Sequence, residues 1–128
     1  MKQKFFATLL ALSSVISMNT AAAATYQFQS GPPVEYSLEP NKPQEFANIF
    51  MWKAKATCKI LTQESQVPIA FTVLRKSGSV NNIKMSTGDS ITLVFYPNQT
   101  VDITAESGGV VRLENLGTKT ISASCATA

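Results

Sequence analysis

The two cysteines, Cys58 and Cys125, are the side chains in this sequence with the most definite chemistry. In an oxidising compartment, a single pair of cysteines is expected to form one intramolecular disulfide. The two residues are 67 positions apart. Closing a loop of that length stabilises a fold by about 4 kcal/mol in the chain-entropy model. We expect a disulfide between them, and the alternatives are a metal-binding pair or a free thiol.

Histidine is absent from the chain, and its absence restricts the chemistry that the sequence can support. It excludes Ser-His-Asp and Cys-His nucleophilic machinery, histidine general-base catalysis and most zinc sites. The carboxylates are left, and two of them could form a glycosidase pair if the fold brought them together. We therefore expect no catalytic residue, no metal and no cofactor. The eight carboxylates are Glu35, Glu39, Glu45, Glu64, Asp89, Asp102, Glu106 and Glu114.

Lysines alternate with small residues in the segment NIFMWKAKATCKI, residues 48–60. On a strand, Lys53 and Lys55 are one repeat of about 7 Å apart, and Lys59 lies farther along the same face. Such a strip would attract an anionic partner, such as lipopolysaccharide, an anionic glycan or an acidic protein surface. The alternative interpretation is a solvated face that discourages aggregation. Three more basic residues would extend the strip if they fold to the same side: Arg75, Lys76 and Lys84.

The same strand face begins with two apolar residues, Ile49 and Met51. We expect the N-terminal segment, residues 25–33, to cover them, because its Tyr26 and Phe28 also need an apolar contact. The alternative is an exposed patch on which a partner docks, including by adding a strand to this one.

These side chains depend on a strand that we expect to run, long or bent, over residues 45–62. Because side chains alternate along a strand, one face is apolar and should point into the core. The position of Trp52 on this face predicts that its ring packs beside the disulfide. The residues of the inward face are Phe50, Trp52, Ala54, Ala56, Cys58 and Ile60.

The rest of the chain lacks a helical period and consists of short runs rich in Val, Ile, Thr and aromatic residues, separated by turn residues. Turn residues between the last four runs predict hairpins, and prolines on both sides of residues 34–39 predict an edge strand. A further short strand fits near residues 83–85. The main strands are expected at residues 34–39, 45–62, 68–75, 90–96, 100–105, 110–116 and 118–126.

This pattern predicts an all-β fold over residues 24–128. We expect a single domain, a two-sheet antiparallel sandwich of immunoglobulin-like type with about seven strands. The tryptophan precedes both cysteines, unlike in antibody domains, so the prediction concerns architecture and not family membership. A small closed β-barrel is the alternative.

The first 23 residues have the features of a bacterial secretory signal peptide that is cleaved on export. Lys2 and Lys4 precede an apolar run that is short for a membrane span, and alanines at positions 21–24 supply a cleavage site. Without this segment, nine basic and eight acidic residues give a net charge of +1. We therefore expect export to the periplasm or the medium, no transmembrane segment and no nucleic-acid partner.

Together these features predict an exported, non-catalytic binding module of a bacterial envelope or secretome. It would present a sandwich face or a loop to a protein or to an anionic glycan. Two alternatives belong to other functional classes: a small carboxylate-dependent polysaccharide hydrolase, and a structural subunit of a surface assembly.

Overall fold

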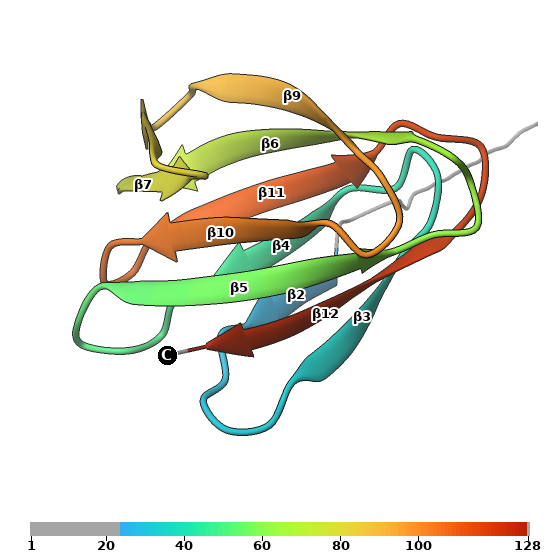
Figure 1. Cartoon of the computed structure of the whole chain (residues 1–128). Helices are drawn as coiled ribbons and strands as arrows, with labels where there is room; N and C mark the ends of the chain where they lie inside the picture. The colour runs from blue at the N-terminus through green and yellow to red at the C-terminus, as the bar shows by residue number, and fades with distance from the viewer. Residues whose placement is uncertain (1–23, 128) are drawn as a thin grey trace, which may run out of the picture.

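The computed structural model describes residues 24–127, which form eleven strands in two packed sheets (Figure 1). The predicted signal peptide, residues 1–23, lies outside the described residues. The six-stranded sheet has the order β3 (Val34–Leu38), β12 (Ile121–Thr127), β5 (Ala54–Leu61), β10 (Thr100–Ala105), β7 (Ser77–Val80) and β8 (Ile83–Ser86). The five-stranded sheet has the order β2 (Ala24–Gln27), β4 (Gln44–Ala47), β11 (Val110–Asn115), β6 (Val67–Arg75) and β9 (Ser90–Phe95).

The two-sheet sandwich predicted from the sequence is confirmed. The closed barrel is excluded because, within residues 24–127, each sheet ends in two strands with a single neighbour. Strand pairs are antiparallel except for β2 and β4, which are parallel. The sequence pattern predicted fewer strands, because β2, β4 and β7 have only four residues each. The short strand predicted near residues 83–85 is confirmed as β8. Within residues 24–127, no helix has the length and apolar character needed to cross a bilayer.

The core lies between the sheets and follows from the two-residue period of the strands. Buried and exposed side chains alternate along β5, and buried and partly buried ones alternate along β6. The largest fully buried side chains include Leu38, Ile60, Phe71 and Phe95, which come from both sheets. Because both inner faces are apolar, packing them together removes one continuous hydrophobic surface from water.

The last four strands do not form hairpins, so that prediction was wrong. β9 and β11 belong to the five-stranded sheet, whereas β10 and β12 belong to the six-stranded sheet. The turn residues between them do reverse the chain, but each reversal carries it across the sandwich to the other sheet. Turn chemistry sets a change of direction and does not by itself set the pairing partner. The edge position predicted for residues 34–39 is confirmed, since among the described strands β3 pairs only with β12.

The long strand predicted over residues 45–62 is two strands in different sheets, β4 and β5, joined by a loop over residues 48–53. The predicted alternation is correct from Ala54 onward and fails before it. Phe50 is only partly buried, and Trp52 is exposed rather than packed beside the disulfide. The physical reason is Asn48, whose side-chain hydrogen bonds replace the strand ladder at this point.

The disulfide between Cys58 and Cys125 is present, as predicted. The two residues are directly opposite each other on the neighbouring strands β5 and β12, with Cα atoms 4.0 Å apart. The bond therefore cross-links two strands of one sheet, whereas the disulfide of antibody domains joins the two sheets. It ties the C-terminal strand to the centre of the six-stranded sheet.

Candidate functional site

The loop between β4 and β5 presents a group of exposed apolar side chains at one end of the sandwich. Ile49 is 57% exposed, Met51 87% and Trp52 60%. With the partly buried Phe50, these four consecutive residues form what we call the apolar tip. The other large exposed apolar residues are spread over β8, the region of β9 and the loop after β11: Ile83, Val94, Tyr96 and Leu116.

The expectation that residues 25–33 cover Ile49 and Met51 was wrong. Tyr26 and Phe28 instead contribute to the core from the β2 side, where the Tyr26 ring lies 4.7 Å from that of Tyr36 and 5.3 Å from that of Phe46. Their apolar surface is therefore buried elsewhere, and the tip is left without a cover from this segment.

The tip is ordered by Asn48, whose side chain is almost completely buried. Its amide nitrogen donates to the carbonyls of Trp52 (2.9 Å), Ala105 (3.0 Å) and Glu106 (3.2 Å). Its side-chain oxygen accepts from the backbone nitrogen of Phe50 at 2.9 Å. One side chain thus satisfies backbone groups at both ends of the loop and fastens the loop to the connection between β10 and β11. A buried amide with all its bonds made fixes a single loop conformation.

Further contacts hold the tip against the β10–β11 connection, residues 106–109, which turns at the same end of the sandwich (Figure 1). Asn48 exchanges backbone hydrogen bonds with this connection, donating to Gly109 and accepting from Gly108. The Ser107 hydroxyl donates to the Phe50 carbonyl at 2.7 Å. The Phe50 and Trp52 rings stack with centroids 5.0 Å apart and planes at 5°. Because the backbone and rings are fixed, the tip would lose little conformational freedom on binding.

Two of the predicted basic residues lie beside the tip. Lys53 follows it directly and is exposed. Lys76 lies against Gly108, since a Cβ added to that glycine would be 3.7 Å from the Lys76 Cε atom. Gly108 in turn donates its backbone hydrogen bond to Asn48. The apolar tip is therefore flanked by two cations from separate segments of the chain.

The remaining basic residues are distributed over both sheets. Lys55 and Lys59 lie on the exposed outer face of β5, as the alternation predicted. Lys84 shares an open hollow of about 550 Å³ with Lys53 over β7, β8 and β10. Arg75 belongs to the other sheet, where it lines a hollow with Glu45 and Val110. The structure therefore brings Lys53, Lys76 and Lys84 to one region and does not add Arg75 to the strip.

Nearby acids reduce the charge of the strip along β5. The Lys55 amine lies 3.9 Å from an Asp102 carboxylate oxygen, and the other oxygen of that carboxylate accepts from the Thr57 hydroxyl at 2.8 Å. Glu106 lines the hollow that contains Lys53 and Lys84. Acids therefore offset part of the positive charge both along β5, at Asp102, and beside the tip, at Glu106.

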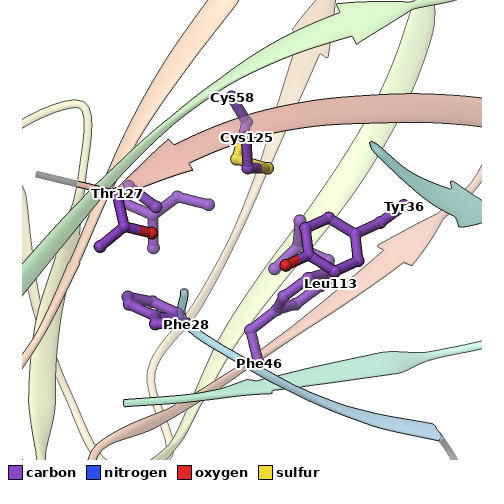
Figure 2. Close-up of a pocket in the computed structure, with 9 residues that line it drawn as sticks. Phe28, Tyr36, Phe46, Cys58, Leu113, Cys125 and Thr127 are labelled. Carbon is purple, nitrogen blue, oxygen red and sulfur yellow. A yellow bond between two sulfur atoms is a disulfide. The ribbon is translucent and has the colours of Figure 1, made fainter. Parts of the chain in front are cut away.

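A small cavity lies between the sheets beside the disulfide, and it is too small for a ligand. Figure 2 shows Phe28 and Phe46 facing the sulfur atoms from the side of the five-stranded sheet. The volume of the cavity is about 20 Å³, which is room for about one water molecule. Burial raises the pKa of the Tyr36 phenol in its wall, and the neighbouring Tyr26 adds to the rise. This cavity is a packing gap of the core and offers no binding site for a larger molecule.

The described residues provide no metal centre, because they contain no group of three or more His, Cys, Asp or Glu side chains that could hold an ion. The hollow over β7, β8 and β10 has one carboxylate in its wall, Glu106, whereas a glycosidase site requires two. The hydrolase alternative stays a prediction and gains no support from this hollow. No protein-family model, curated protein or solved structure matches the chain.

The sequence led to most of the residues of this region and missed Asn48, which organises it. The available signal was a polar residue inside an otherwise apolar run, FANIFMW at residues 46–52. Its bonding partners Ala105 and Glu106 are 57 and 58 residues away. A local pattern cannot identify partners at that separation.

Proposed function

We propose that this protein is an exported, non-catalytic binding module that docks through the apolar tip on an anionic lipid surface of the cell envelope. The observation that carries the proposal is an ordered loop with three large apolar side chains exposed at its end. Export is supported by the signal-peptide features of residues 1–23 and by the disulfide, which forms in oxidising compartments.

The exposure of the tip favours a role in contact rather than in folding. Ile49, Met51 and Trp52 are exposed in the connection between the two sheets, where polar residues would serve equally well. Exposing Ile49, Met51 and Trp52 to water gains no stability for the fold. A contiguous exposed apolar patch is instead typical of an interaction surface.

The chemistry of the tip favours an amphipathic anionic surface as the partner. Tryptophan combines a large apolar ring with an N–H donor, and for this reason it concentrates at membrane interfaces. Lys53 and Lys76 flank the tip, and each lysine near an anionic membrane surface contributes about 1 kcal/mol to binding. Anionic phospholipids and lipopolysaccharide share this combination of phosphate groups and acyl chains.

The test is flotation of the disulfide-bonded protein, lacking residues 1–23, with three kinds of vesicle. One contains phosphatidylcholine alone, one adds phosphatidylglycerol, and one adds lipopolysaccharide. We expect flotation with both anionic kinds, weakened by high salt because the lysine contribution is screened. Flotation only with lipopolysaccharide would support the proposal and narrow the surface to that lipid. Failure to float with either anionic kind would overturn the lipid assignment and favour a protein partner.

Matched variants test whether the tip is the docking element. Ile49→Ser combined with Met51→Ser removes about 3 kcal/mol of apolar burial and should weaken binding roughly a hundredfold. Its free energy of unfolding should change by less than about 0.5 kcal/mol, because both side chains are exposed. Leu116→Ser removes an exposed apolar residue from the loop after β11 and serves as the control that keeps binding.

Charge variants test the electrostatic part separately. Lys53→Glu replaces an attractive charge beside the tip with a repulsive one and should weaken binding about thirtyfold at low salt. Lys59→Glu makes the same change six residues along β5, about 20 Å away, which exceeds the Debye length of about 8 Å at physiological salt. Equal effects of the two substitutions would show attraction by overall charge and would contradict docking through the tip.

A further inference from the structure

The strand β9 differs from the three other edge strands of the sandwich because it has no feature that prevents another strand from pairing with it. Within residues 24–127 it pairs with β6 alone. No charged residue occurs between Asp89 and Asp102, and no proline occurs within the strand. Natural proteins usually protect an edge with charges, prolines or a short strand. An uncharged edge of six residues is therefore open to pairing.

The other three edges carry such protection. β3 lies between Pro33 and Pro40 and includes the exposed Glu35. β8 has only four residues, and one of them is the exposed Lys84. β2 also has four residues. The contrast shows that β9 is the edge with the longest unprotected backbone among the described residues.

The register of β9 identifies the backbone groups that face outward. Val73 of β6 donates its N–H to the Asp89 carbonyl at 3.0 Å, and its carbonyl accepts from the Gly88 N–H at 2.8 Å, so both of its backbone groups face the β9 side. Because hydrogen-bonded pairs alternate with non-bonded pairs in an antiparallel ladder, Ile91, Leu93 and Phe95 bond to β6. The N–H and C=O groups of Ser90, Thr92 and Val94 therefore point away from the sheet. Tyr96 closes this free edge by bonding to Gln99 through both of its backbone groups.

We propose that two copies of the chain pair through β9, antiparallel, about a twofold axis that passes through Thr92. This register places Thr92 opposite Thr92 and Ser90 opposite Val94, so all outward backbone groups of both strands gain partners. It also places Ile91 opposite Leu93 on the core face, where both side chains are only partly buried in the single chain. Their remaining apolar surface would be covered by the second copy.

The sequence of β9 suits a second copy better than an unrelated strand. The residues on either side of Thr92 are similar in kind. Ile91 and Leu93 next to it are both aliphatic, and Ser90 and Val94 beyond them are both small. A strand without charges brings no like charges opposite each other when it pairs with itself. Pairing across a twofold axis uses the same surface on both copies and closes at the dimer, so it does not extend into a fibre.

The test is the mass of the disulfide-bonded protein, lacking residues 1–23, measured by sedimentation over a concentration series. We expect a monomer–dimer equilibrium. Hydrogen exchange supplies the second readout, because the amides of Ser90, Thr92 and Val94 should become protected as the concentration rises. A monomer at every concentration would overturn the proposal. So would a dimer in which these three amides exchange as fast as in the monomer.

Substitutions at Thr92 separate pairing from folding. Thr92→Lys places two lysines opposite each other on the axis, and Thr92→Pro removes an outward N–H without removing a bond to β6. Both variants should lose the dimer and keep the circular dichroism of the folded monomer. Thr92→Val keeps the strand geometry and should keep the dimer. Dimers of unchanged affinity in the two folded disruptive variants would place the contact elsewhere and overturn the proposal.

Discussion

Two buried asparagines lie at opposite ends of the β11 ladder and support loops of opposite character. Asn48 bonds to Gly109 before the start of β11 and carries the apolar tip. Asn115 is the last residue of β11 and is completely buried. Its amide nitrogen donates to the carbonyls of Leu38 (2.9 Å) and Lys119 (2.8 Å), and its oxygen accepts from Gly117 at 2.8 Å. The same bonding device therefore orders a loop at each end.

The difference lies in what each loop exposes. Between Asn115 and the start of β12, the loop reads Leu-Gly-Thr-Lys-Thr, with one apolar residue of moderate exposure, Leu116. The loop after Asn48 exposes Ile49, Met51 and Trp52. A buried asparagine can thus order a connection of this fold without an apolar tip. The apolar residues at one end call for an explanation by binding, and the other end provides an internal control.

Removing the disulfide, which lies between the two ends, should change the free energy of unfolding more than any substitution at either end. Replacing Cys58 and Cys125 with alanine should lower the free energy of unfolding by about 4 kcal/mol, because the unfolded chain gains freedom. Both ends should unfold together, since the disulfide cross-links β5 and β12 of the six-stranded sheet. Denaturant unfolding followed by circular dichroism and by Trp52 emission measures this, and the two midpoints should coincide. A free energy unaffected by reducing agent would refute the stabilising role.

Alanine at each asparagine should have a smaller effect and should separate the two ends. Asn48→Ala and Asn115→Ala each leave several buried backbone groups without partners and should cost about 2 to 3 kcal/mol. Only Asn48→Ala should also weaken flotation with anionic vesicles, because the tip loses its fixed conformation. Denaturant unfolding and flotation of both variants provide the check. Full binding by a folded Asn48→Ala protein would show that the tip does not require this support.

The sequence predicted those features that depend on local alternation and turns. The two-residue period of a strand places Cys58 on the inward face of β5 and the lysines on its outward face. The prolines on both sides of β3 indicate its edge position. The tip could not be predicted in this way. Its apolar residues continue the alternation of β5, and only the bonds from Asn48 to Ala105 and Glu106 end the strand. The sheet to which each of the last four strands belongs likewise depends on strands that are far away in the sequence.

Emission of Trp52 tests docking through the tip most directly, because it is the chain's single tryptophan and is 60% exposed. Titration with phosphatidylglycerol vesicles should shift its emission to shorter wavelength, and lipids brominated on their acyl chains should quench it. The Ile49→Ser, Met51→Ser variant should show neither change at the same lipid concentration. Emission that stays unchanged while the protein floats with the vesicles would contradict docking through the tip.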